Sequence, residues 1–182
     1  MVRWKPRFSL RAFLVGFVLL ALAIYKIHDY YYEPHLIEVG RYPITVDYSK
    51  TLEEMIAAGK YDYVNSEITS INFPIPSDKS GSKNPEAIIL HFNKRIDTEK
   101  LLKILNRKGF RPGTLPELLA FGAKYPEAQI RHWVIALGSS WQDSGGGRRV
   151  VWLGGGVGHR PAALDDRRSW WVRSARFLAF RK

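Results

Sequence analysis

Arginine and tryptophan side chains recur together near the C-terminus of this 182-residue sequence, at Arg167, Arg168, Trp170, Trp171, Arg173 and Arg176. Such side chains bind single-stranded nucleic acid by stacking and phosphate contact, and they are also enriched where proteins bind one another. A third interpretation is purely structural. In it, alternate residues such as Trp171 and Phe177 enter the core while the arginines face solvent.

The candidate recognition segment extends from these residues back to Arg148. Its candidate binding residues are Arg148, Arg149, Trp152, His159, Arg160, Arg168, Trp170 and Arg173. Because Trp170 and Trp171 are adjacent, one must face inward and the other outward if they lie on a strand. We expect the segment 148–173 to contact a protein or cell-surface ligand.

The other side chains with chemical potential form no recognisable constellation. The 5 histidines, at positions 28, 35, 91, 132 and 159, lack metal-ligand spacing. Asp165 and Asp166 could act as an acid–base pair, but neighbours on an extended segment point apart, which favours a solvated charge run. The absence of cysteine excludes disulfides and thiol chemistry. We therefore expect no catalytic residue, metal or cofactor, with an envelope-associated enzyme or accessory factor as the alternative.

The net charge of +11 comes from the two ends of the chain. Residues 1–12 carry four Lys/Arg and no acid, residues 13–147 carry fifteen of each sign, and residues 148–182 carry nine bases against two acids. Bases directly before an apolar run are typical of a cytoplasmic flank, so residues 1–11 are interpreted in that way.

The apolar run that follows predicts a transmembrane anchor over residues 12–27. A cleaved signal peptide, with the small residues of "ALA" at 21–23, and a buried core helix are the alternatives. The first two place the rest of the chain across the membrane, as a single-pass protein with a cytoplasmic N-terminus or as a secreted one. That location argues against nucleic acid as a partner.

The remaining chain predicts a juxtamembrane linker over residues 28–43 and one α+β domain over 44–182. Helices are expected at 51–59 and 98–108, and a third begins after the capping-box residue Thr114. Strands are expected at 86–92, 132–141, 148–155 and 175–181, which places His91 and His132 in strands. Helices thus come first and short antiparallel strands last.

Two parts of the chain resemble known families. The leader "PRFSLRAFLVGFVLLALAI" resembles that of planctomycete-type membrane proteins, which favours a retained anchor. "FRPGTLPELLAFG", "VIALGSSW" and "RFLAFRK" are similar to a helix start and two core strands of C-type-lectin-like domains of the formylglycine-generating-enzyme type. They also look like uncharacterised bacterial proteins related to diversity-generating-retroelement targets, where a divergent segment between such strands is the ligand-binding face.

The chain departs from this pattern in two respects. It has no cysteines for formylglycine-generating activity, and it has no Glu-Pro-Asn or Trp-Asn-Asp cluster for calcium-dependent sugar binding. The resemblance thus implies a C-type-lectin-like domain with helices packed on short antiparallel strands and with no inherited catalysis. Together with the leader, it implies a membrane-anchored, non-catalytic ligand-binding or display protein.

Overall fold

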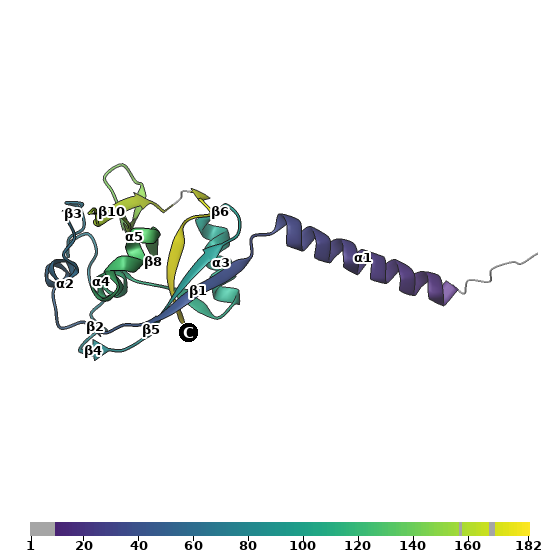
Figure 1. Ribbon diagram of the computed structural model, residues 1–182, viewed down its shortest axis with the longest axis horizontal. Helices are drawn as coiled ribbons and strands as arrows, with labels where there is room; N and C mark the ends of the chain where they lie inside the picture. The colour runs from purple at the N-terminus through teal and green to yellow at the C-terminus, as the bar shows by residue number, and fades with distance from the viewer. Residues whose placement is uncertain (1–9, 157, 168–169) are drawn as a thin grey trace, which may run out of the picture. The chain divides into compact units, whose positions relative to one another are not determined.

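A computed structural model describes residues 10–156, 158–167 and 170–182 of the protein. The chain divides into two compact units, Met1–His35 and Leu36–Lys182, which are described separately (Figure 1). Most of the basic flank 1–11 lies outside the described residues, and so does Arg168 of the candidate binding residues.

The first unit contains helix α1, Leu10–Tyr32, whose 23 residues extend beyond the expected span 12–27 at both ends. At 1.5 Å per residue the helix is about 35 Å long, compared with a hydrocarbon core of about 30 Å. Its apolar side chains are exposed, for example Phe13 at 69% and Leu19 at 61%. The 18-residue window Arg11–His28 has a mean hydropathy of 1.7 and none of it is buried. By length and composition α1 could cross a membrane, a property that signal sequences share.

The second unit is built on an eight-stranded sheet in the order β1-β5-β12-β8-β9-β10-β3, with β7 also paired to β12. The strands are β1 Leu36–Pro43, β3 Tyr63–Val64, β5 Glu86–Phe92, β7 Phe110–Pro112, β8 Val134–Gln142, β9 Arg148–Leu153, β10 Pro161–Asp166 and β12 Arg176–Arg181. Two short pairs lie outside it, β2 Val46–Asp47 with β4 Ser82–Lys83, and β6 Ile96–Asp97 with β11 Trp170–Trp171.

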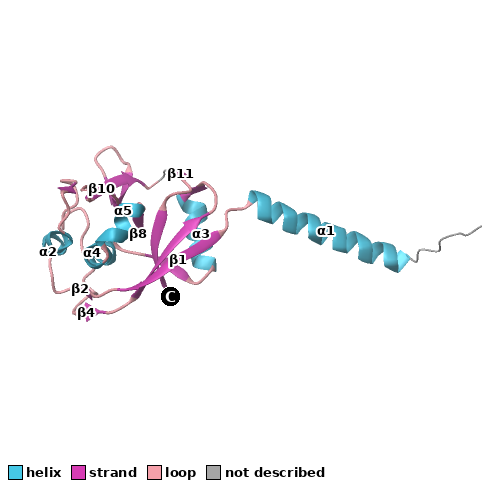
Figure 2. Ribbon diagram, viewed as in Figure 1, coloured by secondary structure: helices cyan, strands magenta, loops and turns pink. Residues whose placement is uncertain are grey.

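The described part of this unit has four helices, α2 Leu52–Gly59, α3 Thr98–Arg107, α4 Leu115–Lys124 and α5 Pro126–Arg131 (Figure 2). Helices α3 and α4 pack on strands of the sheet, and α2 and α5 pack against α4. Alternate strand residues enter two separate cores. On what we call the first face, Ile89, Val134 and Leu178 pack with residues of α2 and α4. On the second face, Ile88, Ile135 and Phe177 pack with residues of α3. The fold is therefore a mixed α/β structure with helices on both sides of one sheet.

The expected capping boxes are confirmed. Thr51 Oγ1 accepts the N–H of Glu54 at 3.2 Å, and Glu54 Oε2 accepts the N–H of Thr51 at 2.8 Å. At the start of α4, Glu117 Oε2 accepts the N–H of Thr114 at 2.8 Å. These contacts satisfy backbone donors that a helix start leaves unpaired, which is why both helices begin where the sequence indicates.

Several expectations about the elements were wrong. The second half of the expected linker 28–43 is strand β1, and the compact unit starts at Leu36 instead of residue 44. Strand β10 and helix α5 were not expected, and His132 follows α5 without lying in a strand. The sheet is also not wholly antiparallel. β12 is parallel to β8, and β10 is parallel to β3. Both pairs join strands that are far apart in the sequence, and only such long connections allow parallel pairing.

Candidate binding surface

The two adjacent tryptophans of β11 point in opposite directions, as expected. Trp171 is 4% exposed and packs edge-on against Phe177, with ring centroids 5.7 Å apart. Its indole N–H donates to Thr98 Oγ1 at 2.8 Å. Trp170 is 55% exposed, and the guanidinium carbon of Arg95 lies 5.5 Å from its ring centroid. Trp171 therefore belongs to the core, and Trp170 is available for contact.

A polar hollow of about 270 Å³ lies beside Trp170. We call it the Arg148 pocket, and its lining residues are Asp97, Thr98, Glu99, Arg148 and Arg167. Trp170 is not one of the lining residues, but it is the cross-strand partner of Asp97, which is. Sequence reasoning missed the three residues 97–99, because they lie in another part of the chain.

Hydrogen bonds hold the walls of the Arg148 pocket together. The hydroxyl of Thr98 donates to the carbonyl of Arg167, and the N–H of Arg167 donates to the carbonyl of Arg148 at 2.6 Å. Asp97 Oδ1 accepts the N–H of Lys100 at 2.8 Å as the N-cap of α3. Among the described residues, the Nε of Arg167 is buried without a hydrogen-bond partner. The two guanidinium groups and two carboxylates of the lining can bind a polar ligand that has both donors and acceptors.

Arg149 is held by a neighbouring turn instead of facing a ligand. Its Nε donates to Asp143 Oδ2 at 2.7 Å, and Asp143 Oδ1 accepts the N–H of Gly147 at 2.8 Å. The bond from Arg149, followed by the bond from Gly147, lowers the pKa of Asp143. Arg149 also alternates with Arg148 along β9, so the two side chains point to opposite faces. Its contacts stabilise the turn between β8 and β9.

Trp152 forms a pair with Trp133, another residue that sequence reasoning missed. The ring centroids are 5.2 Å apart, and Trp133 is 52% exposed. Gly154 makes this pair possible, because a Cβ there would lie 2.6 Å from Trp152 and 2.7 Å from Trp133. The signal in the sequence was strand alternation, which places Trp133 on the same face as Ile135.

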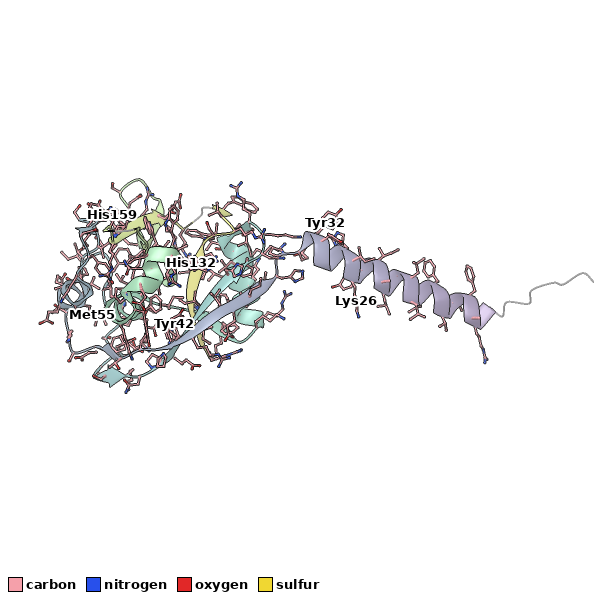
Figure 3. All side chains as sticks on the ribbon, in the orientation of Figure 1. Lys26, Tyr32, Tyr42, Met55, His132 and His159 are labelled. Carbon is pink, nitrogen blue, oxygen red and sulfur yellow. The ribbon has the colours of Figure 1, made fainter. Side chains whose placement is uncertain are left out.

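His159 and Arg160 both contact Asp62. Asp62 Oδ2 is 3.2 Å from His159 Nδ1 and accepts the N–H of Arg160 at 2.8 Å. Burial alone would raise the pKa of Asp62, but the Arg160 N–H and the His159 ring outweigh it and lower the pKa. This pair fixes the turn before β10, and Figure 3 shows His159 beside that strand.

The guanidinium of Arg160 links β10 to the helices of the first face. Its Nη2 donates to the carbonyl of Gly122 at 3.1 Å and to Gln129 Oε1 at 3.3 Å, and its Cζ lies 5.5 Å from the Tyr61 ring centroid. Gln129 is fully buried. Arg160 therefore has a structural role.

The candidate binding residues thus divide between separate places. Arg148 lines the Arg148 pocket and Trp170 lies beside it, whereas Arg149, Trp152, His159 and Arg160 contact other groups. Arg173 is exposed, and its carbonyl accepts a bond from Arg176 Nη1 at 3.2 Å. Among the described residues, no group of three or more His, Asp or Glu side chains is placed to hold a metal ion.

No family model matches the chain, and neither a curated protein nor a solved structure matches it.

Proposed function

We propose that the protein is a single-pass, membrane-anchored binding protein that displays a non-catalytic recognition domain of C-type-lectin-like type. One observation carries the proposal. Trp170 is exposed beside the Arg148 pocket, whose arginines and carboxylates come from two distant parts of the chain. Exposed Trp and Arg side chains of this kind are frequent hot spots of binding surfaces. The partner is a protein or another cell-surface molecule.

Two further features support the location and the fold. The exposed apolar surface of α1 follows a basic N-terminal flank, which favours a cytoplasmic N-terminus and a domain on the other side of the membrane. The two stretches that resemble C-type-lectin-like core strands, "VIALGSSW" and "RFLAFRK", fall on β8 and β12, which are paired in the sheet.

Binding is tested with the full chain in lipid nanodiscs and an array of purified envelope polymers and cell-surface proteins. Trp170→Ala and Arg167→Ala should each weaken binding to a captured array component at least tenfold, with nearly unchanged melting temperatures. Trp133→Ala is the matched control, because Trp133 has a similar exposure of 52% but lies outside the Arg148 pocket. Equal binding by the original chain and all three variants contradicts the proposal. So does the absence of binding to any array component.

A further inference from the structure

A groove of about 300 Å³ lies over the first face of the sheet, away from the Arg148 pocket. Its lining residues are Val39, Tyr42, Ile89, Phe121, Glu127, Ala128, Arg131, His132 and Val134. Ile89, Phe121 and Val134 are buried and give it an apolar floor. This volume is at the small end of the range for ligand pockets, about 300 to 1,000 Å³. The groove therefore suits a small molecule with an apolar body.

One end of the groove is cationic. Arg176 on β12 is the register partner of the groove residue Val134, and adjacent partners point to the same face of the sheet. His91 follows Ile89 by two residues along β5 and therefore shares its face. Phe177 pairs with Leu90, so His91 and Arg176 occupy the next adjacent positions of these two strands. Arg131, the last residue of α5, and His132, which follows it, complete this end.

The charges at this end interact with one another. Burial, followed by the charge of Arg176, lowers the pKa of His91 and of His132. Arg176 Nη1 donates to the carbonyls of Arg173, Ser174 and Ala175, which hold the guanidinium in place. Its Nε is buried without a hydrogen-bond partner among the described residues. The ionisable groups of the groove and its cationic end are Tyr42, His91, Glu127, Arg131, His132, Arg173 and Arg176. Glu127 is the one carboxylate among the lining residues.

We infer that this groove binds a small amphiphilic carboxylate, with its apolar body over Ile89 and Val134 and its carboxylate at His132, Arg131 and Arg176. A guanidinium and imidazole cluster facing an apolar floor matches such an anion, because charge-assisted hydrogen bonds orient the carboxylate while apolar contact holds the rest. The site is separate from the proposed recognition surface, since the Arg148 pocket includes residues of α3 and α3 packs on the second face.

The test uses the full chain in zwitterionic nanodiscs, with 4-phenylbutyrate as the probe and empty nanodiscs as the blank. Binding is followed through the ring signals of ¹³C-labelled histidine, assigned by His132→Gln and His91→Gln. We expect saturable shifts of both signals, and at least tenfold weaker binding of the neutral analogue 4-phenylbutanamide. No saturable shift, or equal binding of the two probes, overturns the inference.

Three variants localise the binding. Arg131→Glu reverses an exposed charge at the cationic end and should weaken binding at least tenfold without loss of folding. Ala128→Leu fills the groove and should abolish binding while the charges stay unchanged. Arg148→Gln, which removes a charge from the other site, should bind as the original chain does. Unchanged binding by Arg131→Glu overturns the inference even if Ala128→Leu fails to fold. Histidine shifts that appear only in anionic nanodiscs, without added probe, also overturn it, because the cationic end then contacts a bilayer.

Discussion

The indole N–H of Trp171 donates to the hydroxyl of Thr98 at 2.8 Å and so joins β11 to the first turn of α3. Thr98 is 3% exposed, and its hydroxyl also donates to the carbonyl of Arg167. One buried hydroxyl therefore connects the core, the helix and the wall of the Arg148 pocket.

Thr98→Val should lower the free energy of unfolding by about 1 to 3 kcal/mol, because it leaves the buried indole N–H without its acceptor. Urea unfolding measures this change. Trp170→Ala is the comparison, since a surface substitution usually changes stability by about 0.5 kcal/mol or less. If Trp170→Ala proves the more destabilising of the two, the directions assigned to the two tryptophans are wrong.

Leu118→Ala and Phe177→Ala should each destabilise the protein by about 2 to 5 kcal/mol, because both remove side chains from the packed cores. Leu118 is 0% exposed in the core of the first face, and Phe177 is 2% exposed in that of the second. Denaturant titration gives the value for each core separately. A loss of under about half a kcal/mol at either position is incompatible with its burial.

Gly154→Ala should be destabilising by about 1 to 3 kcal/mol, because its Cβ would overlap the rings of Trp152 and Trp133. The added Trp133→Ala substitution should recover part of this loss, because it removes one of the two rings. Thermal unfolding of the single and double variants measures how far the two stability changes depart from additivity. Strict additivity of the two changes would show that the overlap is not the cause.

Acidification below about pH 6.5, the ordinary pKa of histidine, should destabilise the protein. Burial and then Arg176 lower the pKa of His91 and His132 in the folded state, so the unfolded chain binds more protons in this window. Their contribution is complete above about pH 6.5, the ordinary histidine pKa, and is lost as the pH falls. In the His132→Gln variant, the melting temperature should therefore depend less on pH over this range. The pKa of Asp143 is lowered from its ordinary value of 3.8, so its contribution to stability is lost only at more acidic pH than that of the histidines.

The membrane proposal predicts that the chain stays with membranes after a high-salt wash and is released by detergent. The exposed apolar surface of α1 is the reason, because salt weakens charge contacts and leaves apolar ones intact. Protease added from the extracytoplasmic side should digest the C-terminal domain. Recovery of the chain in the soluble cytosol would rule out both an anchor and a signal peptide.

Local signals in the sequence predicted much of the fold. The helices α2 and α4 were correctly placed because Thr51 and Thr114 begin capping boxes, a pattern contained within four residues. Strand β5 was recognised from its apolar run, which is buried on both faces. These elements depend on neighbours in the sequence, so the sequence alone carries their signal.

Elements that form only through contacts with distant parts of the chain were not predicted from the sequence. Most side chains of β1 are exposed, so it shows no apolar alternation, and its pairing with β5 makes it a strand. The six-residue helix α5 is too short for a periodic signal. The Arg148 pocket was missed for the same reason: Trp170 meets Asp97 only through β11–β6 pairing, which spacing cannot reveal.

The position of β12 has a consequence for the rate of folding. This strand lies between β5 and β8, so Phe177 must find both Leu90 and Ile135 before the sheet is continuous. Phe177 is far from both partners in the sequence, so each pairing closes a long loop at a cost in chain entropy. Domains dominated by pairing between distant segments fold in about milliseconds to seconds. Until β12 arrives, the edges of β5 and β8 are open to other chains, so a newly made molecule is most prone to aggregation during that interval.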